Sequence, residues 1–269
     1  MADEGRGRTA LVTGASAGIG EAFARELASH GFDLVLTARR LERLEALAAE
    51  FRTAHGVRTL CIAADLAEPS APARLVERIR ADGVHVDFLV NNAGFGVAGY
   101  FSETSWKEQA DFIQVLVTSG AHLTHLLLPG MIERGFGRIV NVASLAGLLP
   151  GTAGHTLYGA AKAFMIKFSQ SVALEQAGTG VSATAVCPGF TFSEFHDVVG
   201  NRAQVSKLPS FMWMTSKDVA VEGYAAAMRG DVVWVNGALN RGVAALGKLI
   251  PDRLALRASA RGSKSLRKR

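Results

Sequence analysis

Short apolar runs alternate with amphipathic stretches along most of this 269-residue chain, and this alternation limits the folds that it can adopt. A helical pattern follows the second run, where Leu41, Leu44 and Leu47 share one face. Strands that alternate with helices favour βαβ units and a parallel sheet covered on both faces. Right-handed crossovers then predict a single α/β domain with a doubly wound, seven-stranded parallel sheet. The expected strands are Thr9–Thr13, Leu34–Ala38, Thr59–Ala63, Phe88–Val90, Arg138–Val142, Val181–Val186 and Val232–Val235.

The charge of the chain is concentrated at its C-terminal end. Hydrophobic residues make up 49% and charged residues 20%, which is typical of a folded globular protein. The formal net charge is +5, but Arg241–Arg269 holds nine Lys or Arg against one Asp, so the remainder carries −3. A body that is mildly acidic argues against a basic groove for nucleic acid.

The ends of the chain and its cysteines predict a cytoplasmic location. Met1–Arg8 is polar and lacks the apolar stretch of a signal peptide, and we expect no apolar run to span a bilayer. Cys61 and Cys187 each lie in a strand-like run and are expected to be free thiols in a reducing compartment. Motifs for a metal site are absent from the sequence, so no metal is expected.

A glycine-rich turn, Thr13-Gly-Ala-Ser-Ala-Gly-Ile-Gly20, follows the first expected strand and precedes an expected helix at Glu21–Ser29. Glycines at such a place let the backbone approach a pyrophosphate, and the helix N-terminus offers free N–H groups and partial positive charge. A tight turn with incidental glycines is the alternative. The position of the turn at the head of a βαβ unit favours dinucleotide binding by a Rossmann-like sheet.

The Gly-x-x-x-Gly-x-Gly spacing resembles that of the short-chain dehydrogenase/reductase family. Further matches follow in order: Asp65-Leu66, Asn91-Asn-Ala-Gly94, Ser144, Tyr158-Gly-Ala-Ala-Lys162 and Pro188-Gly189. This resemblance covers nearly the whole chain and implies an oxidoreductase that moves a hydride between a nicotinamide and a carbonyl or alcohol. The positions that it assigns to the cofactor, together with the arginine discussed next, are Gly14, Ser16, Gly18, Ile19, Gly20, Arg39, Asp65, Leu66, Asn91, Ala93, Gly94, Tyr158, Lys162, Pro188, Gly189 and Thr191.

The end of the second expected strand predicts NADP(H) over NAD(H). An NAD site usually carries an acidic residue there, bonded to the ribose 2′-hydroxyl. Ala38 occupies this position, and Arg39 and Arg40 follow. A guanidinium pairs with a 2′-phosphate that a carboxylate would repel, so Arg39 is the first choice. The alternative is that both arginines begin a solvated helix, and the family's frequent second basic residue is replaced by Ala17.

Ser144, Tyr158 and Lys162 are the expected catalytic residues. Tyr158 and Lys162 are spaced i, i+4 and share one helix face. A cation about 4 Å away contributes roughly 4 kcal/mol at an effective dielectric near 20, so Lys162, helped by oxidised nicotinamide, is expected to lower the pKa of Tyr158 from ~10 towards neutrality. Tyr158 would then serve as acid/base while Ser144 steadies the substrate oxygen. His155 lies nearby as an alternative base, although we expect it to shape the pocket. Ser144 is not expected to be a nucleophile, because no Gly-x-Ser-x-Gly elbow surrounds it.

One position departs from the family pattern. Many members have an Asn in the helix before the fifth strand, where it holds a water that connects the Lys to solvent; here that position is Leu116. The relay could use the main-chain carbonyl of Leu116 or the hydroxyls of Thr118 and Ser119. A binding protein that senses NADP(H) without turnover is therefore a second hypothesis. A sugar-nucleotide epimerase or dehydratase is a third, disfavoured by chain length and glycine spacing.

Two C-terminal segments complete the expectations. Residues 190–214 look loop-like but are rich in aromatic side chains, which suggests a substrate lid on the catalytic domain, residues 1–239. With Phe95, Val97, Leu149 and Leu157 near the pocket mouth, the expected substrate is a small molecule with a bulky hydrophobic group: a ketone, an alcohol or an acyl-chain carbonyl. The alternative is that the aromatic side chains pack only against the protein or a partner subunit. The basic tail, residues 240–269, is expected to be frayed and solvated, with weak contact to an anionic membrane surface as the alternative. The family resemblance also implies a homodimer or homotetramer.

Overall fold

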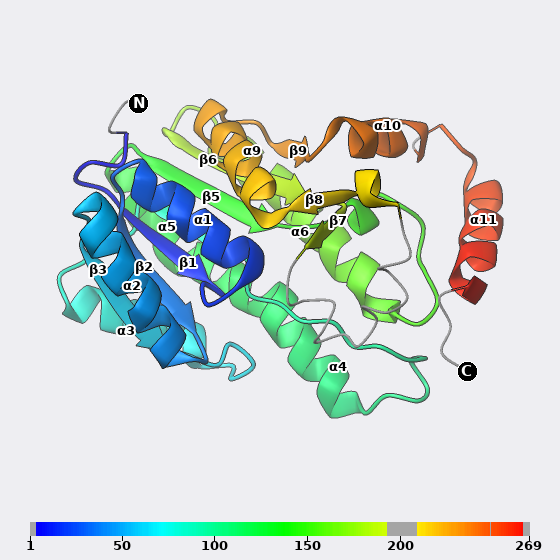
Figure 1. Cartoon of the computed structure of the whole chain (residues 1–269), viewed down its shortest axis with the longest axis horizontal. Helices are drawn as coiled ribbons and strands as arrows, with labels where there is room; N and C mark the ends of the chain where they lie inside the picture. Colours follow the sequence, from blue (N-terminus) through cyan, green and yellow to red (C-terminus); the bar gives the residue numbers. More distant parts are fainter. Residues whose placement is uncertain (1–3, 193–208, 248, 266–269) are drawn as a thin grey trace.

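The computed structural model, which describes residues 4–192, 209–247 and 249–265, has the expected α/β architecture. A seven-stranded parallel sheet forms its centre, in the order β3-β2-β1-β4-β5-β6-β9 (Figure 1). Each predicted strand is confirmed with ends shifted by at most one residue. The strands are β1 (Thr9–Thr13), β2 (Asp33–Ala38), β3 (Thr59–Ala63), β4 (Phe88–Asn91), β5 (Gly137–Val142), β6 (Val181–Cys187) and β9 (Val233–Val235).

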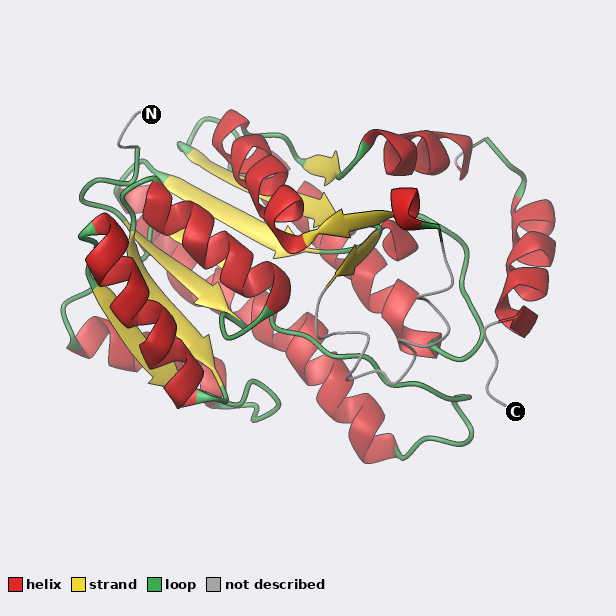
Figure 2. Cartoon of the chain, in the orientation of Figure 1, coloured by secondary structure: helices red, strands yellow, loops and turns green. Residues whose placement is uncertain are grey.

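Helices cover both faces of the sheet (Figure 2). One core cluster contains apolar side chains from α1 (Gly18–Ser29), α2 (Leu41–His55) and α9 (Ser216–Arg229). The other contains side chains from α3 (Ala71–Ala81), α5 (Ser119–Glu133) and α6 (Thr156–Glu175). Alternate residues of β1 belong to opposite clusters, as the two-residue period of a strand requires. Both faces are therefore apolar, which explains the nearly continuous hydrophobic runs in the sequence.

A long helix crosses the molecule from Trp106 to Glu133. It consists of α4 (Trp106–Ile113), a π-helical turn η1 (Gln114–Thr118) and α5. By length and composition these 28 residues could cross a membrane, which the sequence analysis did not anticipate. Phe112, Leu116 and Leu123 are nevertheless buried in the protein core. We interpret the segment as a core helix.

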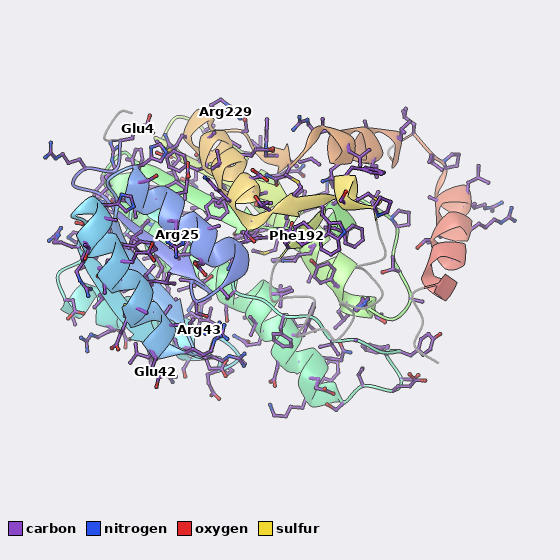
Figure 3. The ribbon with its side chains drawn as sticks, in the orientation of Figure 1. Glu4, Arg25, Glu42, Arg43, Phe192 and Arg229 are labelled. Atoms are coloured by element: carbon purple, nitrogen blue, oxygen red, sulfur yellow. The ribbon has the colours of Figure 1, made fainter. Side chains whose placement is uncertain are left out.

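The segment from 190 to 214 is more ordered at its ends than predicted. β7 (Phe190–Phe192) and β8 (Trp213–Thr215) pair in parallel as a separate two-stranded sheet, preceded at β8 by the 3₁₀ turn η3 (Ser210–Met212). The rings of Phe192 and Trp213 stack with their centroids 4.6 Å apart, which stabilises the pairing. Phe192, at the end of β7, is labelled among the side chains in Figure 3. The prediction of a loop is wrong at these two strands, while residues 193–208, including Ser193 and Phe195, lie outside the described residues.

The C-terminal end is helical rather than frayed up to residue 265. It forms α10 (Ala238–Gly247) and α11 (Asp252–Ser265), so the proposed boundary at 239/240 falls inside α10. Asn240 and Ala244 are buried on the inner side of α10, which anchors this helix to the sheet domain. In α11 the hydroxyl of Ser259 donates to the carbonyl of Gly151 at 2.7 Å. These contacts are the reason why the prediction of a frayed end fails.

Candidate active site

The glycine-rich turn is tightly fitted at the carboxyl end of β1. Gly14 and Gly18 adopt φ values of +65° and +61°, which favour glycine. At Gly20 a Cβ atom would lie 2.3 Å from the Gly14 carbonyl oxygen and 2.4 Å from Asn92 Nδ2. Any side chain at Gly20 would therefore push the turn away from its position.

The turn presents the N-terminus of α1 to the same sheet edge. α1 begins at Gly18, three residues earlier than predicted, and its preceding residue, Ala17, provides no side-chain cap. The first N–H groups of the helix are consequently available to an anion. Ala15 N donates to the Thr37 carbonyl at 3.2 Å, which ties the turn to β2. This geometry fits a pyrophosphate group.

Two residues that the sequence analysis did not select hold the glycine turn against the end of β4. The hydroxyl of Thr13 accepts from the N–H groups of Asn92 (2.9 Å) and Ala93 (3.0 Å) and donates to the Val90 carbonyl at 3.1 Å. In return, Asn92 Nδ2 donates to the Thr13 carbonyl at 2.9 Å. Their presence in the motifs Thr-Gly and Asn-Asn-Ala-Gly was the available signal. Thr13 and Asn92 thus act on the site by holding the backbone of the glycine turn in position.

Buried amides fix the sheet beneath the site. Asn91 Nδ2 donates to Asn141 Oδ1 at 2.9 Å and to the Gly120 carbonyl at 3.2 Å. Asn141 Nδ2 in turn donates to Ser169 Oγ at 2.8 Å. This chain joins β4, β5, α5 and α6. Asn91 is thus bound to the protein through its amide nitrogen, and its Oδ1 has no hydrogen-bond partner among the described residues.

Ser144, Tyr158 and Lys162 lie together where β5 ends, although these residues are separated along the chain. The side chains of Ser144 and Tyr158 share a hydrogen bond. Lys162 Nζ lies 5.7 Å from the centre of the Tyr158 ring and donates to the Val142 carbonyl at 2.7 Å. Ser144 caps the short turn η2 (Leu145–Gly147), since its Oγ accepts from Ala146 N at 3.1 Å. The end of β5, the turn η2 and the helix α6 therefore bring the side chains of Ser144, Tyr158 and Lys162 together.

Burial dominates the ionisation of this cluster in the protein alone. Burial lowers the pKa of Lys162 to about 8, because the ammonium loses its hydration. Burial also raises the pKa of Tyr158, and the hydrogen bond from Ser144 only partly opposes this. In the protein without its cofactor Tyr158 therefore favours its neutral form, and the combined effect of Lys162 and oxidised nicotinamide on its pKa stays a prediction.

Two neighbours of the cluster stay neutral. Burial lowers the pKa of His155, which outweighs the effect of its hydrogen bond with the Val97 backbone. Burial raises the pKa of Cys187 to about 12, so this thiol is neutral at physiological pH. Cys61 and Cys187 are both free, as predicted. Neither group offers a charged nucleophile at the site.

Leu116 lies in the π-turn η1 and packs beside the site. A Cβ atom on Gly94 would touch Leu116 Cγ at 3.4 Å. Leu116 and Lys162 both line a small cavity. The volume of this cavity that the centre of a water molecule can reach is about 10 Å³. Of the alternative relay groups, Thr118 is exposed. Ser119 Oγ instead donates to the Leu66 carbonyl at 2.8 Å. The cavity has room for about one water.

The expected 2′-phosphate position has two exposed arginines. Arg39 follows β2 directly and is exposed, whereas Arg40 reaches the glycine turn, where its guanidinium donates to Ser16 Oγ at 3.2 Å. The sequence analysis ranked Arg39 first and did not anticipate the contact of Arg40. Asp65 is exposed after β3 and accepts from Ala67 N at 3.0 Å. The three residues lie at the edge of the sheet formed by β1, β2 and β3.

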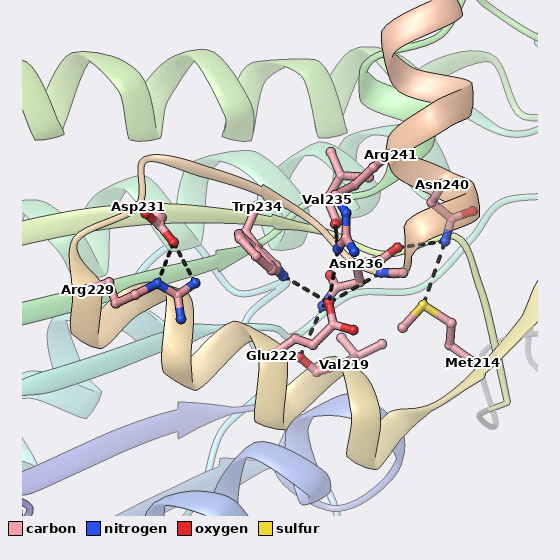
Figure 4. A network of polar contacts seen from close by, with 11 residues as sticks. Met214, Val219, Glu222, Arg229, Asp231, Trp234, Val235, Asn236, Asn240 and Arg241 are labelled. Atoms are coloured by element: carbon pink, nitrogen blue, oxygen red, sulfur yellow. Dashed lines mark hydrogen bonds and ion pairs between the residues drawn. The ribbon is translucent and has the colours of Figure 1, made fainter.

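The loop after β6, which contains Pro188 and Gly189, is held in place by contacts with the C-terminal helix α10. Thr191 is buried in β7, and its hydroxyl donates to the Gly189 carbonyl at 3.2 Å. Asn240 on α10 packs directly on this loop, because a Cβ atom on Gly189 would lie 2.6 Å from its amide atoms. Asn240 Nδ2 also donates to the Asn236 carbonyl at 2.8 Å and contacts Met214 Sδ at 3.6 Å (Figure 4). Sequence analysis missed Asn240, since no motif marks it.

A carboxylate organises the segment that leads into α10. Glu222 Oε2 accepts from Trp234 Nε1 at 2.9 Å and from Gly237 N at 3.3 Å (Figure 4). Gly237 has a φ of +78°, which permits the turn from β9 into α10. Asn240 is thereby fixed against the Pro188–Gly189 loop.

Comparison with known proteins identifies the family. The short chain dehydrogenase model matches residues 8–203. The chain is 38% identical to nodulation protein G of Rhizobium sp. (strain N33), over 87% of this chain and 97% of that protein. It is 32% identical to the 3-oxoacyl-[acyl-carrier-protein] reductase FabG of Haemophilus influenzae, over 87% and 98%. A short-chain dehydrogenase from Sphingobium yanoikuyae in complex with NADPH superposes with a TM-score of 0.80 and 33% identity, over 93% and 95%.

The chain therefore belongs to the short-chain dehydrogenase/reductase family. It is an oxidoreductase of the class that interconverts CH–OH and C=O groups.

Proposed function

We propose that this protein uses NADPH to reduce a hydrophobic ketone or acyl-chain carbonyl, with Tyr158 as the acid. The observation that carries the proposal is the hydrogen bond between Ser144 and Tyr158 beside the buried Lys162. The names of the FabG reductase and of the NADPH complex support the substrate class and the cofactor. The bound nicotinamide would supply the hydride.

The chain's own residues would bind the substrate oxygen and move the proton. Ser144 and Tyr158 would donate hydrogen bonds to this oxygen, and Tyr158 would transfer its phenolic proton as negative charge develops there. The Lys162 ammonium would stabilise the resulting phenolate by electrostatic attraction. A water in the small cavity beside Leu116, held by main-chain groups of η1, would carry a proton to Lys162 in place of the missing Asn side chain.

The residues present fit NADP(H). Gly14, Gly18 and Gly20 have no side chains to cover the backbone at the uncapped start of α1, where a pyrophosphate would be bound. Ala38 leaves the end of β2 without a carboxylate, and Arg39 and Arg40 offer two guanidinium groups for a 2′-phosphate. We assign the remaining cofactor contacts to the positions that the family motifs predict.

Tyr158→Phe tests the reaction. Loss of the proton donor is expected to lower kcat by about 10²–10⁴-fold, because a general acid contributes that much. The measurement is consumption of NADPH with bulky aromatic ketones and 3-oxoacyl thioesters, with acetone as a small control substrate. NADPH affinity should be nearly unchanged, and Tyr100→Phe in the loop before α4 serves as the matched control. An unchanged kcat in Tyr158→Phe overturns the mechanism.

The second hypothesis, a sensor of NADP(H), gives a different pattern. The wild-type chain would then bind NADPH tightly and consume none of it with any carbonyl in the panel. Leu116 motivates this alternative, since its side chain offers no hydrogen bond.

Arg39→Ala tests the cofactor preference. Loss of a charge-assisted hydrogen bond worth about 1.5–3 kcal/mol should weaken NADPH binding roughly 10- to 100-fold. Binding of NADH should change little, as measured by titration calorimetry with both cofactors. Arg40→Ala is the matched variant, because its guanidinium contacts the glycine turn. Equal losses for NADPH and NADH in both variants contradict the assignment.

We further propose a cytoplasmic homodimer or homotetramer that packs through the helices Trp106–Glu133 and α6. Large apolar side chains on these helices, Trp106, Phe164 and Leu174, are exposed in the single chain. Light scattering coupled to size exclusion measures the subunit number directly. A monomer at micromolar concentration would overturn this part of the proposal.

A further inference from the structure

The C-terminal helices carry a row of exposed apolar side chains. Asn240 and Ala244 occupy the buried side of α10, and the aliphatic side chains of the neighbouring side are exposed. The row continues past the end of α10 into the turn before α11. Leu246 and Leu249 are exposed by 63% and 79%. We call this row the apolar ridge; it consists of Leu239, Val243, Leu246, Leu249 and Ile250.

The spacing of the ridge is that of one helix face. Leu239, Val243 and Leu246 are related by i, i+4 and i+7, so their side chains share one side of α10. Exposed apolar residues that are scattered singly need no explanation, but five exposed aliphatic side chains within twelve residues, beside a charged segment, indicate an interaction surface. α10 is held firmly through Asn240 and Glu222, so the ridge is presented on a fixed support.

The same segment holds the positive charge of the protein. Residues 241–269 contain nine Lys or Arg and one Asp, a net +8 on a chain whose remainder carries −3. Arg253 and Arg257 lie one turn apart on α11 and are exposed. α10 and α11 together form one end of the molecule (Figure 1).

We propose that α10 and α11 dock the protein on a membrane surface that contains anionic lipids. The apolar ridge would enter the boundary between headgroups and acyl chains, while the arginines of α11 would pair with lipid phosphates. A second copy that used the same surface would bring two segments of +8 together, which is unfavourable. A nucleic acid would satisfy the charges but would leave the aliphatic ridge in water. The bilayer is the occupant that matches both features.

The docking surface borders the segment that we expect to cover the substrate. Asn240, on the buried side of α10, contacts Met214 of β8, and β8 pairs with β7 after the Pro188–Gly189 loop. A protein seated on α10 and α11 would therefore hold β7 and β8 near the membrane. Vesicle binding is measured without turnover, so its failure does not bear on carbonyl reduction, and loss of reductase activity does not bear on docking.

Vesicle flotation of the full chain tests the proposal. The protein should float with vesicles of mixed phosphatidylcholine and phosphatidylglycerol and stay behind with pure phosphatidylcholine. Added salt should weaken binding, because it screens the headgroup charges. The double variant Arg253→Gln/Arg257→Gln should bind roughly 10- to 30-fold more weakly, since each cation near the surface contributes separately.

Matched variants separate the two features of the surface. Leu246→Ser/Leu249→Ser should weaken binding to mixed vesicles at every salt concentration, whereas Val221→Ser, at an exposed aliphatic position on α9, should bind like the wild type. Lys167→Gln/Lys217→Gln removes two exposed charges elsewhere and is the control for α11. Circular dichroism melts monitor folding in each variant, and all of these positions are exposed.

Three outcomes overturn the proposal. The first is the absence of wild-type binding to both kinds of vesicle. The second is equal binding to mixed and pure vesicles. The third is a subunit number that falls in Leu246→Ser/Leu249→Ser while the wild type does not float, which would assign the ridge to an interface between copies of this chain.

Discussion

The sheet edge that carries the candidate site and the C-terminal end of the molecule are built in opposite ways. At the edge, backbone and side chains are packed so closely that Gly20 leaves no room for a Cβ atom, and Lys162 is buried. At the C-terminal end, Gly242 on α10 has no neighbouring atom within 4 Å of a Cβ, and Leu249 is almost free of contacts. The difference indicates that the edge positions reacting groups, whereas the C-terminal end offers a surface to something outside the chain.

The two glycines give the strongest test of this comparison. Gly20→Ala places a methyl group 2.3 Å from the Gly14 carbonyl, so the turn must shift. Overpacking of this kind costs about 1–3 kcal/mol of unfolding free energy. Misplacement of the turn by about 1 Å should lower NADPH affinity on the order of 100-fold. Thermal unfolding and calorimetric titration with NADPH measure both effects.

Gly242→Ala is the matched variant and should have the opposite sign. An alanine within a helix and in open space stabilises the protein by about 0.4–1 kcal/mol, because it restricts the unfolded chain. NADPH binding should not change. If Gly242→Ala destabilises the protein as much as Gly20→Ala does, α10 is packed against something and the comparison fails.

Two lysines on α6 extend the comparison to charge. Burial lowers the pKa of Lys162 from 10.5 to about 8, so the folded protein binds this proton less tightly than the unfolded chain does. Below pH 8 the buried ammonium therefore costs up to about 3 kcal/mol, at about 1.4 kcal/mol per pKa unit. Lys162→Met removes that cost and loses a hydrogen bond to the Val142 carbonyl worth about 1 kcal/mol. We expect a net gain of about 2 kcal/mol at pH 7, together with loss of activity.

The gain should depend on pH with a definite sign. Between pH 8 and 10.5 the folded wild type loses the proton that the unfolded chain still binds, so wild-type stability rises and the advantage of Lys162→Met disappears. Unfolding curves in denaturant at several pH values measure this difference. Lys167→Met, one and a half turns along the same helix and exposed, should show neither the gain nor its pH dependence. A constant advantage for Lys162→Met would mean that packing rather than charge is responsible.

The sequence predicted most of the ordered sheet and the grouping of the motifs, because both depend on patterns within short segments of the chain. Apolar runs and helix periodicity define β1 to β6 and β9, and parallel strands bring the ends of β1, β4, β5 and β6 to one edge. The effect of burial on Tyr158 and Lys162 could not be read from spacing, because desolvation depends on the surrounding fold. The helical C-terminal end was also missed. Its stability depends on tertiary contacts such as that of Ser259 with Gly151.

Asn240 is where the two regions meet, and its replacement should have the smallest of these effects. The Asn240 amide packs on Gly189, donates to the Asn236 carbonyl and contacts Met214, so α10 supports the loop that precedes Thr191. Asn240→Ala should raise the KM for NADPH about 3- to 10-fold, equivalent to one lost hydrogen bond of about 1 kcal/mol, and change kcat less. Steady-state kinetics with varied NADPH measure this split.

Leu239→Ala, the preceding and exposed position on α10, is the control and should leave both constants unchanged. A structural role alone would lower the melting temperature of Asn240→Ala without moving the KM for NADPH. That result would mean that α10 is independent of the cofactor loop. A raised KM would mean instead that the buried side of α10 supports the cofactor loop. A partner bound to the exposed side of the same helix could then change cofactor binding, and the C-terminal surface and the sheet edge would be coupled through the side chain of Asn240.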